Sequence, residues 1–86
     1  MNWYLYIVKC ADSSLYTGIT TDLVRRIKEH NTDTTRGAKS LRGKKPVVLV
    51  YSETLLNRSA ASLREAAIKK MSRTEKLDLI KNVISS

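Results

Sequence analysis

The 86-residue chain carries 16 lysine and arginine residues against eight aspartate and glutamate residues, which gives a formal net charge of +8 at pH 7. Apolar residues make up 42% of the sequence and charged residues 28%, a globular composition that excludes a disordered or low-complexity chain. This excess of positive charge favours a polyanionic partner such as nucleic acid. The length predicts one domain, residues 1–86, with a single hydrophobic core.

We expect neither a targeting segment nor a membrane-spanning helix in this sequence. No apolar run approaches the roughly 20 residues that a membrane-spanning helix needs, and the N-terminus lacks the residue order of a signal peptide. The single cysteine, Cys10, cannot form an internal disulfide, and we expect it to be a buried strand residue. These features predict a cytoplasmic protein without a membrane partner.

The first predicted elements form a β-hairpin. Residues 3–9 are large, aromatic or β-branched and predict a strand with Tyr4 and Tyr6 on the same face. Four turn-forming residues follow, and residues 15–19 predict the second strand. Gly18 lies inside this second strand, where a glycine indicates a bulge or the close approach of another group.

A helix is predicted after the hairpin. Residues 20–22 supply candidate N-cap side chains, and the helix is expected to end near Asn31. Arg26 and His30 lie four residues apart and therefore share a helix face. The predicted apolar stripe of the helix comprises Leu23, Val24 and Ile27.

A basic loop and a third strand follow. Residues 32–45 show no periodicity, and we interpret them either as a solvated charge run or as a clamp for a phosphate backbone. The apolar run at residues 47–51, after Pro46, predicts the best-buried strand of the sheet. The cations of the loop are Arg36, Lys39, Arg42, Lys44 and Lys45.

Two helices are predicted in the last third of the chain. Ser59 or Ser62 is expected to begin the first, and Ser62 with Glu65 fits a capping box. Ser72 with Glu75 repeats this pattern before the second helix. The predicted apolar positions are Leu63, Ala67 and Met71 in the first helix and Leu77, Ile80 and Ile84 in the second. The predicted element order is therefore β-β-α-β-α-α.

Taken singly, the candidate functional residues have structural explanations, because strand tyrosines usually pack and helix arginines are usually solvated. Their combination is more specific. The tripeptides Tyr4-Leu5-Tyr6 and Tyr16-Thr17-Gly18 are followed by Arg26, by His30 and by Glu65 in the helix after the third strand. This set resembles the GIY-YIG nuclease superfamily over nearly the whole chain. The segments YTGITTDLVRRIKEHN, GAKSLRGKKPVVLVYSE and REAAIKKMSRTEK resemble its small stand-alone members.

The resemblance implies an α+β fold, in which helices flank a small three-stranded antiparallel sheet. It also implies a metal-dependent endonuclease that acts on DNA, with RNA left open, as a monomer with one Mg²⁺ or Mn²⁺ ion. A structure-specific role in repair or recombination would fit so small a domain. The implied catalytic residues are Tyr6, Tyr16, Arg26 and His30, with Glu65 as the metal ligand and Gly18 as a structural residue.

Each implied role has a chemical reason. Arg26 would grip the scissile phosphate with a fork-shaped guanidinium, and Tyr6 would position or deprotonate the attacking water. Tyr16 would donate to the phosphate and His30 would relay a proton. A tyrosine pKa near 10 leaves about one part in a thousand ionised at pH 7, so we expect Arg26 and the metal to lower the pKa of Tyr6.

The chain departs from the fuller family pattern at three positions. Tyr4 replaces the glycine of GIY, Ile19 stands where some members have a lysine, and Leu77 lies near the place of an asparagine in larger nucleases. Two other functions stay open: a non-catalytic nucleic-acid-binding module, and an adaptor for a repair or replication protein. The intact set of candidate catalytic residues favours the endonuclease.

Overall fold

The computed structural model describes residues 2–32 and 43–85. Its element order is β-β-α-β-α-α, as predicted, and within the described part of the chain no helix is long and apolar enough to cross a membrane. The elements are β1 (Trp3–Lys9), β2 (Leu15–Thr20), α1 (Leu23–Thr32), β3 (Val48–Leu55), α2 (Arg58–Lys69) and α3 (Arg73–Ser85).

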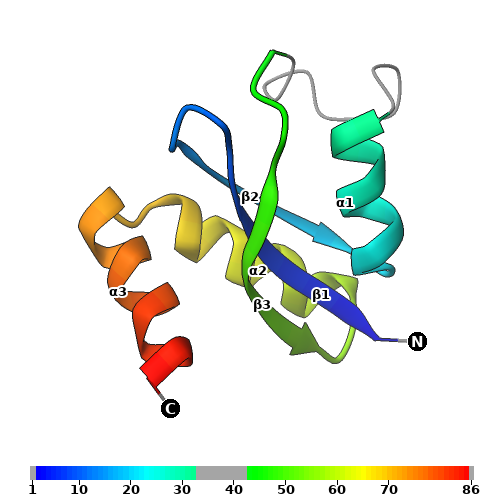
Figure 1. Ribbon diagram of the computed structural model, residues 1–86. Helices are drawn as coiled ribbons and strands as arrows, with labels where there is room; N and C mark the ends of the chain where they lie inside the picture. Colours follow the sequence, from blue (N-terminus) through cyan, green and yellow to red (C-terminus); the bar gives the residue numbers. More distant parts are fainter. Residues whose placement is uncertain (1, 33–42, 86) are drawn as a thin grey trace.

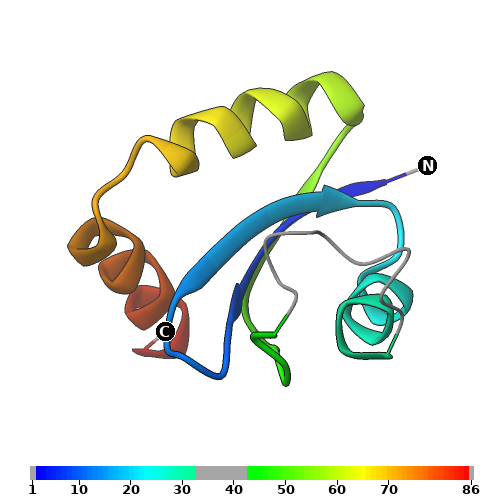
Figure 2. The same cartoon turned by 90° about the horizontal axis from the view of Figure 1, so that it is seen from above.

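The three strands form one antiparallel sheet in the order β2-β1-β3, so β1 is the central strand (Figure 1). Helix α2 covers one face of this sheet, and α1 lies on the opposite side (Figure 2). Residues directly opposite one another on paired strands share a face. Tyr6 pairs with Gly18 on one side and with Ser52 on the other, which places all three on the face that carries α1. The predicted α+β fold is confirmed.

The hydrophobic core has two parts, one on each face of the sheet. Successive side chains of β1 point to opposite faces of the sheet. Leu5 and Ile7 therefore face α2 and α3, and Tyr6 and Val8 face α1. Burying an aliphatic side chain of this size contributes about 1.5–3 kcal/mol. Cys10 is buried in the second part, as predicted, but it follows the end of β1 and is not a strand residue.

The prediction that the third strand is the best buried was wrong. Val48 at the start of β3 is 60% exposed, whereas β1 contains four consecutive buried residues. Strand β3 lies at an edge of the sheet and has a neighbouring strand on one side only, whereas β1 is central and has one on each side. The apolar residues of β1 are therefore better buried than those of β3. The apolar sequence of β3 therefore lies partly on the surface.

Helix α1 begins where the sequence predicts. The Asp22 carboxylate accepts a hydrogen bond from the Arg25 backbone N–H at 3.0 Å, which satisfies a donor of the first helical turn. The prediction that Val24 faces the core was wrong, since its side chain is 82% exposed. The face toward the sheet is formed by positions 23, 27 and 30, and Val24 is rotated about 100° away from position 23.

The end of α1 is fastened to the start of β3 by one side chain. The Asn31 amide donates to the Val47 carbonyl at 3.1 Å, and the Val47 N–H donates to the Asn31 amide oxygen at 2.7 Å. Both backbone groups of a buried residue are satisfied in this way. The contact fixes α1 relative to the sheet at the end that carries His30.

Helix α2 begins earlier than either predicted start. Its N-cap is Asn57, whose side-chain oxygen accepts a hydrogen bond from the Ala60 N–H at 2.9 Å, and Ser62 therefore lies inside the helix. The predicted capping box with Glu65 and the predicted burial of Leu63, which is 72% exposed, were wrong. Ala61 and Ile68 are the buried residues of α2.

The second predicted capping box is confirmed at α3. The Ser72 N–H donates to the Glu75 carboxylate at 3.0 Å, and the Glu75 N–H donates to the Ser72 hydroxyl at 3.2 Å. This reciprocal pair satisfies two donors at the start of α3. The pKa of Glu75 is held below its usual range by its hydrogen bonds with Ser72.

We expect Asn57→Ala to lower the free energy of unfolding by about 1 kcal/mol, because it removes the N-cap of α2. Ser62→Ala is the matched control and should change this free energy by less than about 0.5 kcal/mol, since Ser62 is an exposed position inside the helix. Urea unfolding followed by circular dichroism measures both. A larger loss from Ser62→Ala than from Asn57→Ala would place the start of α2 at Ser62 instead.

Candidate active site

The side chain of Tyr6 crosses the edge strand β2 at Gly18. A Cβ atom placed on Gly18 would lie 2.5 Å from the Tyr6 hydroxyl oxygen and 2.7 Å from Cζ, far inside van der Waals contact. Gly18 is therefore the residue that lets the tyrosine ring pass. The sequence indicated a close approach at this glycine, and the structure identifies the approaching group as Tyr6, which is 1% exposed.

Three rings meet around this crossing. The Tyr6 hydroxyl lies 2.8 Å from His30 Nε2 in a buried hydrogen bond. The centroid of the Tyr16 ring lies 6.4 Å from the centroid of the Tyr6 ring and 5.6 Å from that of the His30 ring. Each ring therefore contacts the other two at distances typical of aromatic pairs. These residues, hereafter the Tyr6–Tyr16–His30 cluster, come from β1, β2 and the last turn of α1.

Arg26 lies beside the cluster on α1. Its Nη1 donates to a Glu29 carboxylate oxygen at 3.1 Å. Asp22, four residues before Arg26, caps α1 instead of pairing with the arginine. Burial opposes the charge of Arg26, but its interactions with Glu29 and Tyr6 hold its pKa above the ordinary value. Glu29 was missed, although its spacing of three residues from Arg26 is a recognised ion-pair spacing on a helix.

Glu65 approaches the cluster from α2. Its carboxylate pairs with Lys69 at 3.4 Å and is close enough to Tyr6 to affect the pKa of the tyrosine. Because α2 packs against β2, a carboxylate from one face of the sheet lies within electrostatic range of a tyrosine from the other face. The predicted residues Tyr6, Tyr16, Arg26, His30 and Glu65 are thus brought together.

Burial decides the protonation of the two central groups. It raises the pKa of Tyr6 to about 12, aided by the charges of Tyr16 and Glu65 and opposed by Arg26. Arg26 lowers the pKa of Tyr6, as expected, but burial outweighs the arginine, and the expected effect of a metal ion stays a prediction. Burial, with the charge of Arg26, also holds the pKa of His30 below its usual range. Both side chains are neutral at pH 7.

The hydrogen bond between Tyr6 and His30 allows either direction of donation. The tyrosine donates to Nε2 when the histidine proton is on Nδ1, and it accepts from Nε2–H in the other tautomer. Nδ1 is buried and has no hydrogen-bond partner within the described residues. The pair therefore contains one proton donor and one proton acceptor on side chains that are almost fully buried.

A metal site in this structure would depend on one carboxylate. Within residues 2–32 and 43–85, no group of three or more histidine, cysteine, aspartate or glutamate side chains is arranged to hold a metal ion. Mg²⁺ at phosphate sites is commonly held by one or two carboxylates, with waters and substrate oxygens completing the coordination. The half-buried oxygen ligand of Glu65 fits such an ion.

The structure tests little of the basic-loop prediction. Arg36, Lys39 and Arg42 lie outside the described residues. Lys44 points to the hairpin loop, where its Nζ lies 3.6 Å from an Asp12 carboxylate oxygen. Lys45 is half-buried.

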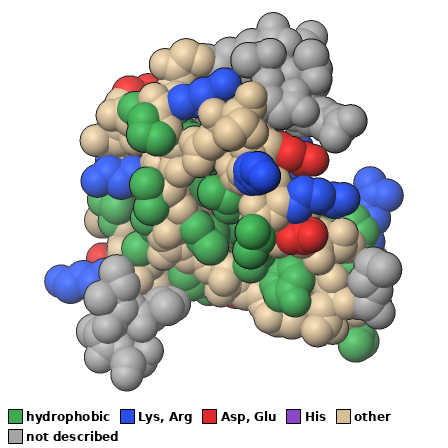
Figure 3. Space-filling model, turned by 45° about the vertical axis from the view of Figure 1, so that its right-hand side comes forward, with side chains coloured by type: hydrophobic (Ala, Val, Ile, Leu, Met, Phe, Trp, Pro, Cys, Tyr) green, Lys and Arg blue, Asp and Glu red, His purple; other side chains and the backbone are tan. Residues whose placement is uncertain are grey.

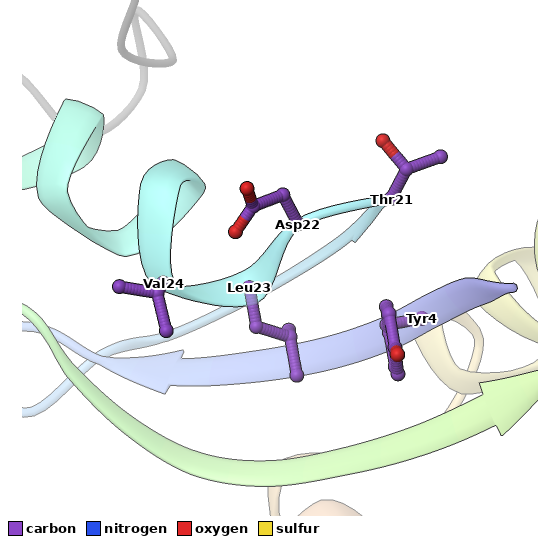
Figure 4. Close-up of a pocket in the computed structure, with 5 residues that line it drawn as sticks. All are labelled: Tyr4, Thr21, Asp22, Leu23 and Val24. Atoms are coloured by element: carbon purple, nitrogen blue, oxygen red, sulfur yellow. The ribbon is translucent and has the colours of Figure 1, made fainter.

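Two adjoining hollows lie beside the first turn of α1. Tyr4, Leu23 and Val24 line one of them together with Thr21 and Asp22 (Figure 4), and its volume is about 280 Å³. The second, of about 300 Å³, shares Leu23 and Val24 and has an almost wholly apolar lining. Figure 3 shows the side that carries α1, where exposed apolar side chains lie among basic and acidic ones. None of the predicted catalytic residues lines either hollow.

The fold and the clustered side chains together define a class of small α+β domain with tyrosine, arginine and glutamate gathered at one sheet edge. Residues 2–78 match the GIY-YIG catalytic domain, and the chain therefore belongs to the GIY-YIG family. This family belongs to a superfamily of nucleases, whose substrates are nucleic acids.

Several relatives match most of the chain. UPF0213 protein DP2720 of Desulfotalea psychrophila is 56% identical over 92% of this chain and 71% of its own length. The solution structure of UPF0213 protein BH0048 from Bacillus halodurans has a TM-score of 0.60 and 42% identity, covering 94% of this chain and 84% of its own. The structure of EF2693 from E. faecalis has a TM-score of 0.68 and 35% identity, covering 100% of this chain and 90% of its own.

We expect Gly18→Ala to destabilise the protein by about 1–3 kcal/mol, because the added methyl group displaces the buried Tyr6 ring. The NMR signals of the His30 ring should shift as its hydrogen bond is lost. Ser52→Ala, at the position that faces Tyr6 from β3, is the matched control and should leave both properties nearly unchanged. If the Gly18→Ala variant is as stable as the wild type and its His30 signals are unshifted, the Tyr6 ring does not pass over Gly18 as described.

We expect the protein to lose stability as the pH falls below about 6.5, the ordinary histidine value. The unfolded chain binds a proton to His30 there before the folded protein does, since the folded pKa is lowered, so unfolding becomes more favourable. Urea unfolding at pH 7.5, 6.5 and 5.5 should show a steeper loss for the wild type than for His30→Gln. Equal pH dependence in the two proteins contradicts a buried neutral His30.

Proposed function

We propose that the protein is a divalent-metal-dependent endonuclease that hydrolyses phosphodiester bonds in DNA. The observation that carries this proposal is the convergence at the β2 edge of a buried tyrosine–histidine pair, an arginine and a half-buried glutamate. Phosphodiester hydrolysis needs an activated water, a cation that stabilises phosphoryl charge, and a metal or acid near the leaving oxygen. The cluster contains a candidate for each requirement.

Arg26 binds the scissile phosphate in this proposal. Its pair with Glu29 is a partly exposed contact between residues three apart on α1, a kind of pair that is worth little in water. A phosphate can accept the same two-point hydrogen bonding from the guanidinium as a carboxylate, and it carries more negative charge. Arg26 therefore exchanges Glu29 for the phosphate at a small cost in free energy. Glu29 keeps Arg26 extended beside Tyr6 until the substrate arrives.

Tyr6 and His30 act together as the base. With a pKa of about 12, only about one part in 100,000 of Tyr6 is ionised at pH 7, so a standing phenolate is a poor catalyst. In the tautomer with a proton on Nδ1, Tyr6 takes a proton from the attacking water while its own hydroxyl proton passes to His30 Nε2. The water oxygen bonds to phosphorus, the bond to the leaving oxygen breaks, and solvent protonates the leaving oxygen.

Glu65 is the proposed metal ligand, and it would hold a Mg²⁺ or Mn²⁺ ion that neutralises charge on the phosphoryl oxygens. In the structure this carboxylate forms an exposed ion pair with Lys69, four residues further along α2. Tyr16 completes the pocket as a hydroxyl donor to the phosphate. The cations at positions 36, 39, 42, 44 and 45 would contact the backbone of DNA, which predicts sequence-independent and salt-sensitive binding.

A nicked or branched DNA is the preferred substrate in this proposal, as expected for an enzyme of recombination or repair. The domain offers little surface with which to read a base sequence, and one arginine with one metal site cuts one strand at a time. RNA is the alternative substrate, and comparison of the two polymers decides between them.

We expect cleavage of labelled duplex, single-stranded, nicked and four-way-junction DNA to require Mg²⁺ or Mn²⁺. Arg26→Ala and Glu65→Ala should each lower kcat by about 100-fold or more, the usual loss for an electrostatic group at a reacting centre. Tyr6→Phe should lower it by about 10²–10⁴-fold, since it removes the proton acceptor. The measurement is the initial rate under saturating DNA.

Arg25→Ala and Asp78→Ala are the matched controls, because each removes the same charge from an exposed helix position. Both should keep most of the wild-type kcat. Full activity of Glu65→Ala in the presence of metal contradicts the assignment of Glu65. If the wild type does not cut while all variants bind DNA with equal salt sensitivity, the binding module replaces the endonuclease.

A further inference from the structure

A polar cluster joins α2 to β3 on the face of the sheet away from α1. Arg64 Nε donates to the two Glu53 carboxylate oxygens at 2.9 and 3.1 Å, and Arg64 Nη2 donates to one of them at 2.9 Å. The Tyr51 hydroxyl donates to the same carboxylate. These three residues, hereafter the Arg64 clamp, were missed by the sequence analysis and have no place in the proposed catalytic steps.

The Arg64 clamp is well built for a partly exposed site. Tyr51 is buried in the core, and the fork of Arg64 meets the carboxylate through two nitrogen atoms, the geometry that gives an ion pair both strength and direction. Burial tends to raise the pKa of Glu53, but its hydrogen bonds with Arg64 and Tyr51 outweigh burial and hold it below the usual range. Glu53 is therefore charged throughout the neutral pH range.

Arg64 and Glu65 are consecutive residues that lie on opposite sides of one buried stripe. Ala61 and Ile68 form that stripe, and positions 64 and 65 fall between them, about 100° apart around the helix. Arg64 reaches β3 at one edge of the sheet, and Glu65 lies near Tyr6 at the β2 edge. A rotation of α2 about its own axis would move both side chains at once.

The apolar contact alone leaves this rotation weakly fixed, because Ala61 is small and Ile68 is the one large fully buried side chain that α2 contributes among the described residues. Helical side chains lie about 5–6 Å from the axis, so a rotation of 20° displaces one by about 2 Å. Displacement of a catalytic group by about 1 Å can cost about 100-fold in rate. The placement of Glu65 therefore requires a second contact.

We propose that Arg64 is a positioning residue that sets the rotation of α2 through Glu53 and thereby holds the Glu65 carboxylate at the active-site edge. The catalytic consequence rests on the proposed function, in which Glu65 is the metal ligand. The orientation of α2 is independent of that function and can be measured without metal or DNA.

The first test measures the orientation of α2 by backbone residual dipolar couplings in the free protein. Arg64→Ala should rotate α2 by about 10° or more relative to the sheet, and Arg64→Lys should rotate it less, because lysine keeps the charge without the fork. Arg73→Ala is the matched control, because Arg73 donates from α3 to the Ser13 carbonyl at 2.8 Å, at a site separate from the clamp. An unchanged orientation in both Arg64 variants overturns the proposal.

The second test is a double-mutant cycle on kcat for DNA cleavage. Arg64→Ala should lower kcat by about 10–100-fold and change KM for DNA by less than about 2-fold, and Arg64→Lys should recover part of the rate. In the Glu65→Ala background the same change should cost less than about 2-fold, because Arg64 acts through Glu65. Equal losses in the two backgrounds overturn the proposal.

Failure of the proposed nuclease function and failure of the positioning role of Arg64 give different results. If the wild type does not cleave nucleic acid, the proposed function fails while the dipolar couplings still decide whether Arg64 sets the orientation of α2. If the wild type cleaves and α2 keeps its orientation in the Arg64 variants, the proposed function stands and the positioning role is overturned.

Discussion

The passage of Tyr6 across Gly18 to His30 is the contact on which the arrangement of the site depends. A tyrosine on the central strand cannot reach past its neighbour unless that neighbour lacks a side chain, and β2 provides a glycine at the residue paired with Tyr6. The hydroxyl then meets His30 at 2.8 Å, which ties the last turn of α1 to β1 across β2. The crossing fixes the position of the tyrosine and the packing of α1 through one contact.

The same contact sets the chemistry that the site can perform. Burial favours the neutral forms of both partners, raising the pKa of Tyr6 to about 12 and lowering that of His30. A mechanism that begins from a phenolate is therefore opposed by the environment of the ring. A mechanism in which the proton moves from water to Tyr6 and from Tyr6 to His30 begins from the neutral pair that burial favours.

Much of the fold and of the candidate site could be predicted from the sequence. Element order and the α1 cap follow from local patterns, whereas the residues gathered around Tyr6 were expected from the family resemblance. The errors concern properties set by distant parts of the chain. The apolar run of β3 is partly exposed because β1 is the central strand, which no property of that run reveals. Asn57 caps α2 in place of Ser62, although both side chains can cap a helix. The contact between Arg64 and Glu53 joins residues 11 apart through a register that only the folded sheet defines.

The candidate catalytic groups come from two strands and from two helices on opposite faces of the sheet, so each helix must be fixed separately for the groups to come together. Helix α1 is held at its end by the hydrogen bonds between Asn31 and Val47 and by the contact between His30 and Tyr6. Helix α2 has a narrow buried stripe and the Arg64 clamp. A chain of 86 residues buries a smaller fraction of its surface than a larger domain does. Directional polar contacts between helix and strand therefore supplement the apolar packing of both helices.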